Sequence, residues 1–376
     1  MRLKSEQKAT MSSALNQEVI ELSENKAMSK GYPRVTIGVP VFNGESFLAK
    51  TLQSLLSQTF SDFEIVISDN ASTDRTEEIC RAFASREPRL RYYRNDINRG
   101  AVWNHNRVFE LARGEFFKWN SADDLCAPEF LARCVAALDQ DPAAVMAVSQ
   151  PEEIDEHEKP LESRTVPSHT LLPAVQRDAP AHVRFRQNIR LDHLCLSIYS
   201  LIRSDVLRRT GPMGGYADSD RVLLAHLALF GPCIVIPETL LFNRDHAGRF
   251  SRSYSRYDEG WRERANWMDP SNAGQWVFPF WKELFELLRV VRLTPLKWQD
   301  RLRCYGEIVR WLRYKGQMRR LYMDATHYPR KWIVRRFPWA RVGWNWLWGE
   351  RDALGPVGNS QSDHKVGSQS ASSGKP

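Results

Sequence analysis

The sequence lacks the features of several protein classes. None of its six cysteines belongs to a Cys-x-x-Cys motif and no histidine cluster lies beside them, which argues against a zinc ribbon or a disulfide framework. Its most apolar stretch, residues 223–242, contains His226, Pro232, Pro237 and Glu238, so it is too broken to span a bilayer. The first 30 residues have no apolar segment typical of a signal peptide. We therefore expect a cytoplasmic protein without membrane spans.

The chain has a surplus of basic residues. Its net charge is +8 over 376 residues and its pI is about 9.2, which indicates an anionic partner such as nucleic acid, a phosphorylated small molecule or a membrane surface. Its length fits two domains or one large one.

Short β-branched or aromatic segments alternate with amphipathic segments between residues 34 and 149. Strands are predicted at 34–41, 63–68, 90–95, 115–120 and 144–149, and helices at 46–58, 74–85, 101–113 and 128–140. This alternation predicts an α/β fold with a parallel sheet covered on both faces.

Polar or turn-forming residues follow three of the predicted strands. They are Pro40, Phe42 and Asn43 after the first, Asp69 and Asn70 after the second, and Asp123 and Asp124 after the fourth. Ligands of such sheets bind beyond the carboxyl ends of the strands, so these residues should converge on one site. The alternative is a solvated loop whose acids cap the next helix.

Residues 271–350 differ in composition from the rest. They contain 16 Lys and Arg against 6 Asp and Glu, and nine of the 13 tryptophans. Segments 280–293 and 305–323 have the pattern of amphipathic helices, which favours contact with an anionic membrane. The alternative is a helical tail packed on the rest of the chain with solvated arginines. Nucleic-acid binding is disfavoured because no nucleic-acid motif accompanies the basic residues.

Four segments, in order, resemble those of family 2 inverting glycosyltransferases. They are VTIGVPVFNGESFLAKTLQSLLSQTFSDFEIVISDNASTDRTEEI, NRGAVWNHNRVFELARGEFFKWNSADDLCAPEFL, GYADSDRVLLAHLALFG and NRDHAGRFS. The resemblance covers about residues 34–252. It implies a doubly wound mixed sheet of the nucleotide-sugar-binding GT-A type and a divalent Mg²⁺ or Mn²⁺. It further implies transfer of a sugar from a nucleotide-diphosphate sugar, with a UDP-sugar as the expected donor, to a hydroxyl of a glycan or lipid-linked acceptor in polysaccharide or cell-envelope biosynthesis.

The resemblance also implies a metal site. The last Asp of the family's DxD element falls on Asp123, while Ser121 replaces the first. Asp124 would act through a water or a sugar hydroxyl, or simply cap the next helix, and Ala122 would line the donor pocket. His246 matches a His that approaches the diphosphate or metal in some members, although a lone loop His can equally be merely exposed.

The base-binding turn and the catalytic base follow in the same way. Asp69 matches the first acid of the turn and Asn70 replaces the second, with a simple turn role as its alternative; Pro40, Phe42 and Asn43 would line the pocket. Arg99 would contact the diphosphate or be solvated. Asp220 takes the place of the general base, with Ser219 replacing a Glu, and Asp218 is the fallback; either could be only a helix cap.

Five regions are expected from these patterns. Residues 1–32 form a polar arm, 33–149 a donor-binding half and 150–252 an acceptor half of the catalytic domain, 253–352 a helical basic extension rich in Trp, and 353–376 a disordered tail. The three missing family carboxylates keep a second hypothesis open, in which the protein is an inactive nucleotide-sugar-binding scaffold at a membrane.

Overall fold

The computed structural model describes residues 31–161, 178–190, 195–249, 260–314 and 316–336. It divides into two compact units, Met1–Asp324 and Ala325–Pro376, and every contact discussed below lies within the first. The predicted arm 1–32, apart from its last two residues, and the tail 353–376 lie outside the described residues.

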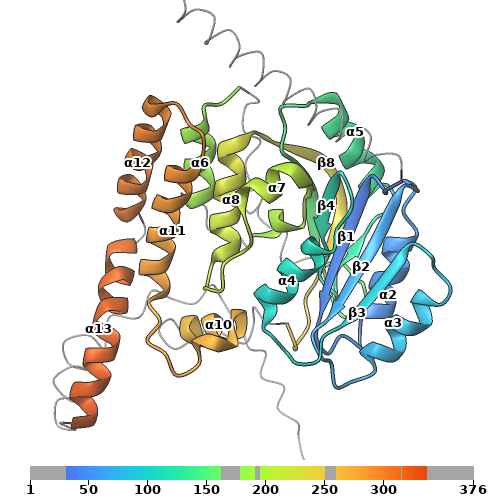
Figure 1. Cartoon of the computed structure of the whole chain (residues 1–376), viewed down its shortest axis with the longest axis horizontal. Coiled ribbons are helices and arrows are strands. Elements are labelled where there is room, and N and C mark those ends of the chain that lie inside the picture. The colour runs from blue at the N-terminus through green and yellow to red at the C-terminus, as the bar shows by residue number, and fades with distance from the viewer. Residues whose placement is uncertain (1–30, 162–177, 191–194, 250–259, 315, 337–376) are drawn as a thin grey trace, which may run out of the picture. The chain divides into compact units, whose positions relative to one another are not determined.

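Eight strands form one mixed sheet (Figure 1). They are β1 (Val35–Val41), β2 (Phe63–Asp69), β3 (Leu90–Arg94), β4 (Phe116–Trp119), β5 (Leu125–Cys126), β6 (Met146–Ile154), β7 (Leu201–Arg203) and β8 (Cys233–Arg244). Their order is β3-β2-β1-β4-β7-β6-β8-β5. The first four are parallel, β7 is antiparallel to both of its neighbours, and β6 and β8 are parallel.

Helices follow most of the strands. They are α2 (Leu48–Leu56), α3 (Thr76–Ala84), α4 (Ala101–Glu110), α5 (Phe130–Gln140), α6 (Ala181–Arg190), α7 (Ser204–Thr210), α8 (Ser219–Phe230), α10 (Gly260–Met268), α11 (Pro279–Leu293), α12 (Trp298–Leu312) and α13 (Gln317–Arg336), with short 3₁₀ turns η1 (Leu196–Tyr199) and η2 (Pro270–Asn272). No helix among these residues is long and apolar enough to cross a bilayer.

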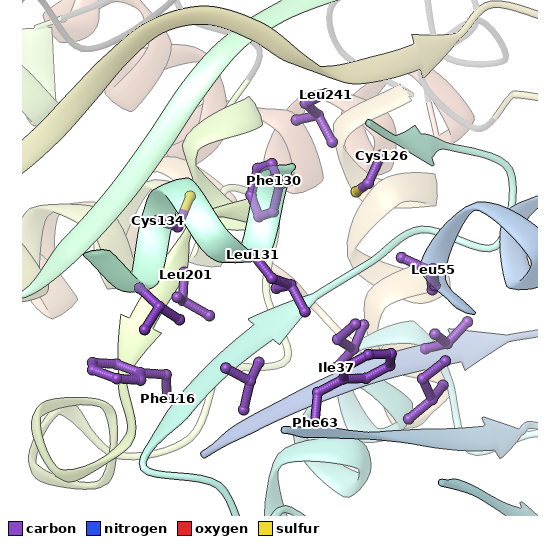
Figure 2. Packing of buried hydrophobic residues seen from close by; sticks show 14 of the residues in the cluster. Ile37, Leu55, Phe63, Phe116, Cys126, Phe130, Leu131, Cys134, Leu201 and Leu241 are labelled. Atoms are coloured by element: carbon purple, nitrogen blue, oxygen red, sulfur yellow. The ribbon is translucent and has the colours of Figure 1, made fainter. Parts of the chain in front are cut away.

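Alternate residues of the central strands point to opposite faces of the sheet, as strand geometry requires. Phe116 of β4 belongs to a core formed with α2, α3 and α5, whereas the next residue, Phe117, belongs to a core formed with α4, α7 and α8. Figure 2 shows the first core, with Leu131 of α5 and Leu201 of β7 in the same cluster as Phe116. The central sheet is therefore buried on both sides.

A third core lies among helices beyond the sheet. Phe185 of α6 and Val222 of α8 pack in one cluster with Leu287 of α11 and Trp311 of α12, and all four are buried. Helices α11 and α12 thus pack through one face on the helix that begins with Ser219 and Asp220.

The five predicted strands are confirmed, but the fifth of them, β6, does not continue the parallel sheet. β6 does not pair with β4, because the three residues of β7 lie between them and run antiparallel to both. The single helix predicted over 305–323 is wrong. The chain turns at Gly316, whose φ of +78° suits glycine, and separates α12 from α13.

Candidate active site

The loop after β4 is braced by buried polar residues. Lys118, which is fully buried, donates to the Trp119 carbonyl (3.0 Å) and to Asn120 Oδ1 (2.8 Å). Asn120 in turn donates to the carbonyl of Ser121 at 2.7 Å. These bonds fix the backbone immediately before Asp123.

Asp123 receives two side-chain hydrogen bonds. Its Oδ2 lies 2.9 Å from His246 Nε2, and its Oδ1 accepts a hydrogen bond from Ser121 Oγ. Burial is the largest single influence and acts to raise the pKa of Asp123, but the hydrogen bonds from His246 and Ser121 together lower it. The carboxylate therefore stays ionised while a quarter of the side chain remains exposed.

Asp124 has a different environment although it is the adjacent residue. Its carboxylate accepts both Asn243 Nδ2, at 3.0 and 2.9 Å, and the Arg244 backbone N–H at 2.9 Å. Burial, followed by the charge of Asp123, raises the pKa of Asp124 to about 7. Asp124 thus links the loop after β4 to the end of β8 and supports the position of Asp123.

The end of β8 supplies residues that sequence reasoning missed. Arg244 is fully buried and donates from Nε to the Asp123 carbonyl at 2.9 Å. Its guanidinium carbon lies 4.9 Å from the centre of the Phe47 ring, and the same ring lies 4.7 Å from the His246 ring. Arg244 and His246 both lie in the segment NRDHAGRFS. Their contacts with Phe47 could not be predicted, because Phe47 belongs to a segment far away in the chain.

Hydrogen bonds to neighbouring residues fix the turn after β2. Asp69 is fully buried, and its carboxylate accepts the Ser72 N–H (2.9 Å) and the Tyr92 hydroxyl (2.8 Å). Asn70 Nδ2 donates to Asn98 Oδ1 at 2.8 Å, and its Oδ1 accepts the Arg99 N–H at 3.0 Å. In this structure both residues shape the turn and the 95–100 loop, and neither side chain is exposed to a ligand.

The residues after β1 are more accessible. Asn43, with φ +53°, accepts the Thr73 N–H through its side chain (2.9 Å), so it ties the β1 turn to the β2 turn. Pro40 is partly buried, and the Phe42 ring is 48% exposed beside them. The Arg99 guanidinium is exposed and stacks over the Trp103 ring at 5.0 Å. Phe42 is thus an accessible aromatic surface at this edge.

The two predicted bases form a second group at the start of α8. Arg264 Nη2 lies 3.6 Å from Asp218 Oδ1 and 4.0 Å from Asp220 Oδ2. Burial raises the pKa of Asp218, while the charges of Arg221 and Arg264 act against it. Asp218 adopts φ +63°, and Asp220 Oδ1 accepts its neighbour's N–H at 2.9 Å.

Arg264 belongs to a segment that the sequence placed outside the catalytic domain. The η2 turn that follows α10 packs against Gly100, where an added Cβ would lie 2.4 Å from Pro270 Cδ. Asn272 Nδ2 donates to the Gly215 carbonyl at 3.0 Å. Residues 260–272 therefore contact both the loop before α4 and the loop before α8.

Whether a divalent ion fits this site depends on the atoms that Asp123 and His246 can offer as metal ligands. Among the described residues no three His, Cys, Asp or Glu side chains converge in a metal-binding arrangement. Asp123 offers carboxylate oxygens, and His246 Nε2, which is bonded to Asp123 Oδ2 here, would become a ligand only on losing its proton and this hydrogen bond. Mg²⁺ is commonly bound by one or two carboxylates plus phosphate oxygens and waters, so the residues fit a site completed by a substrate diphosphate.

Comparisons with known proteins identify a related family. Residues 36–209 match the sequence model of glycosyl transferase family 2. Glycosyltransferase GlyG of Streptococcus pneumoniae is 31% identical over 91 residues, covering 24% of this chain and 30% of the relative. GalNAc(5)-diNAcBac-PP-undecaprenol beta-1,3-glucosyltransferase of Campylobacter jejuni is 32% identical over 93 residues, again 24% of this chain and 30% of the relative. The chain thus matches under a third of the length of these two proteins.

A solved structure supports the architecture over a longer span. The structure of S. aureus TarS 1–349 in complex with UDP-GlcNAc has a TM-score of 0.54 at 17% identity, covering 74% of this chain and 72% of that one. This likeness confirms the predicted mixed-sheet fold of the GT-A type. The match of the family model ends at residue 209, before Asp218 and Asp220, so the roles of these two acids remain predictions.

Proposed function

Because residues 36–209 match the sequence model of glycosyl transferase family 2, we propose that the chain transfers a sugar from a nucleotide-diphosphate sugar to a hydroxyl of a glycan or lipid-linked acceptor. The observation that carries this proposal is the ionised carboxylate of Asp123, held beside His246 in the loop that follows β4. That loop lies beyond the carboxyl end of a parallel strand, where sheets of this type bind ligands.

Donor binding is assigned to the loops that follow β1, β2, β4 and β8. Asp123 and His246 would hold a Mg²⁺ or Mn²⁺, which when bound neutralises the diphosphate leaving group. Phe42 offers its exposed ring to the nucleobase, beside the turn that Asp69 and Asn43 shape. A UDP-sugar is the proposed donor, in keeping with the donor of the TarS complex.

Acceptor activation is assigned to the start of α8. Asp220 accepts the proton of the acceptor hydroxyl as the hydroxyl oxygen bonds to the anomeric carbon and the bond from that carbon to the diphosphate breaks. A single displacement of this kind inverts the configuration of the sugar. Arg264 Nη2 lies 3.6 Å from Asp218 and 4.0 Å from Asp220, so it can hold the two acids in place at the start of α8.

The test is release of nucleotide from UDP-, GDP- and dTDP-sugars in the presence of Mn²⁺ and a panel of glycan acceptors. We expect release from one donor class, dependent on metal and acceptor, and a product of inverted configuration by NMR. Binding of a donor without release or transfer under any of these conditions would contradict the proposal.

One observation favours a second candidate, a nucleotide-sugar-binding scaffold without transfer. Ser121, Asn70 and Ser219 stand where the family carries carboxylates, and the Asn70 amide is already bonded within the protein. Such a scaffold would bind a nucleotide sugar and leave it intact, so the same assay separates the two. In either case we propose a peripheral protein at the cytoplasmic face of a membrane.

A further inference from the structure

Helix α12 carries an apolar stripe on its outer face. Trp298, Leu302 and Val309 are 68%, 58% and 50% exposed. Their spacing of four and seven residues places them on one side of a helix. Residues so large and so exposed are unusual in a row on a protein surface, and a continuous row of them marks a contact site.

The other side of the same helix explains why the stripe points outward. Cys304, Ile308 and Trp311 of α12 are buried in the third core, against α6, α8 and α11. Because this face is already packed, α12 cannot turn its stripe inward without losing that core. The stripe is a fixed feature of the first unit.

Two acids of α11 and α12 are buried towards the third core, whereas several of the arginines of these helices are exposed. The acids Glu283 and Glu307 are buried, and Glu307 lies 3.4 Å from Arg190 of α6. The basic residues Arg292, Arg303, Arg310 and Arg313 are exposed. Arg310 pairs with Glu307 at 2.5 Å and Arg303 with Asp300 at 3.3 Å, whereas Arg292 and Arg313 make no ion pair with the described residues. The exposed face of α11 and α12 therefore keeps an excess of positive charge, carried by Arg292 and Arg313.

We propose that this surface, named the α12 surface and made of Trp298, Leu302 and Val309 with the flanking Arg292, Arg303, Arg310 and Arg313, docks on an anionic lipid bilayer. An amphipathic helix with Trp and Leu between arginines lies in the interface plane with its apolar side chains among the acyl chains. The arginines are then at the level of the anionic headgroups, where each basic residue strengthens binding. The apolar stripe favours a bilayer over nucleic acid, which would bury phosphates rather than acyl chains.

The surface also has a definite relation to the proposed active site. α11 and α12 share the third core with α8, the helix that begins with Ser219 and Asp220. Docking would bring the start of α8 near a lipid-linked acceptor. This last step rests on the proposed function, whereas docking itself does not.

Vesicle flotation of the full chain tests the proposal. We expect the protein to float with vesicles of phosphatidylcholine and phosphatidylglycerol but not with phosphatidylcholine alone, and to be released by raised salt. Trp298→Ser/Leu302→Ser and Arg292→Gln/Arg313→Gln should each weaken binding by roughly tenfold or more. Tyr32→Ser and Arg75→Gln/Arg86→Gln are matched controls at exposed positions outside the extension, and they should bind as the wild type does.

The possible results separate membrane docking from dimer formation through the same surface. Equal flotation of the α12 variants and the controls would overturn it, as would a dimer that dissociates in Trp298→Ser/Leu302→Ser without any vesicle binding. Unchanged circular dichroism and melting temperature show that the variants are folded. Nucleotide release with a water-soluble acceptor should be unaffected by these substitutions, so loss of docking and failure of the proposed transferase reaction are separately visible.

Discussion

His246 Nε2 lies 2.9 Å from Asp123 Oδ2, and this contact joins the loop after β4 to the loop after β8. The two residues are 123 positions apart in the chain, and Arg244 and Asp124 hold the same two loops together from behind. The pairing keeps a partly buried carboxylate ionised at an edge where a diphosphate can reach it.

The two acids at the start of α8 should behave differently. Asp220→Asn removes the proposed proton acceptor and should lower kcat by about 100-fold or more, with donor binding unchanged. Asp218→Asn should lower kcat less, because this carboxylate is largely buried and its pKa is raised by burial. Steady-state nucleotide release and calorimetric donor titration measure the two effects. A fully active Asp220→Asn enzyme would exclude the assignment, and an inactive Asp218→Asn enzyme would transfer it to Asp218.

Arg264 should influence the charge of Asp218. Its Nη2 lies 3.6 Å from Asp218 Oδ1, and its positive charge opposes the rise in the pKa of Asp218 that burial causes. In Arg264→Ala the pKa of Asp218 should therefore rise further, and Arg264→Lys should restore most of the change; NMR titration of the Asp218 carboxyl measures both. Arg221 and Glu283 also act on Asp218, so an unchanged pKa would show that these groups, rather than Arg264, set the charge.

Acid should destabilise the protein partly through His226. Burial lowers the pKa of His226 to about 4, against 6.5 for the ordinary side chain. The unfolded chain therefore binds a proton between these values that the folded chain does not, so stability is complete above pH 6.5 and is lost as the pH falls towards 4. At pH 5 the loss from this residue should be about 2 kcal/mol.

Urea unfolding at pH 7.5 and pH 5 measures this effect. The difference between the two free energies of unfolding should be smaller in His226→Gln than in the wild type, whatever the variant's stability at pH 7.5. His157→Gln, at an exposed position, should leave the difference unchanged. Equal pH dependence in all three proteins would show that His226 does not contribute.

The helical extension should contribute to the stability of the first unit. Leu287 of α11 is fully buried in the third core, whereas Leu302 of α12 is 58% exposed. Leu287→Ala should lower the free energy of unfolding by about 2–5 kcal/mol, and Leu302→Ala, its matched control, by under about 0.5 kcal/mol. Equally small changes would indicate that residues 279–312 do not fold together with the sheet.

The first half of the sheet could be predicted because its signals are local. β1, β2 and β3 are each followed directly by a helix, and β4 by the two residues of β5 and then α5, so the alternation predicts that Phe63–Asp69 and Phe116–Trp119 lie in a parallel sheet. β7 could not be predicted, since three residues, Leu201–Arg203, have no pattern of their own. Their place between β4 and β6 depends on pairing partners that lie more than 50 residues away in the chain.

The candidate site likewise contains residues that could be predicted from the sequence and residues that could not. Asp123 and Asp69 were predictable because each lies at the carboxyl end of a strand, but the different environments of Asp123 and Asp124 were not. That difference comes from the end of β8, which places Asn243 on one acid and His246 on the other. Arg264 was missed because its helix lies beyond the recognisable motifs, and only the fold brings it to α8.

Calorimetric titration of UDP into the wild type and Asp123→Asn, each with and without Mn²⁺, tests the central claim most directly. Asp123→Asn keeps the shape of the side chain and removes its charge, and Asp62→Asn is a control at an exposed acid outside the site. We predict that Mn²⁺ strengthens UDP binding by about tenfold or more in the wild type and Asp62→Asn, and not in Asp123→Asn. Equal Mn²⁺-dependent binding by all three proteins would contradict the assignment of Asp123 as the ligand of a diphosphate-bound metal ion.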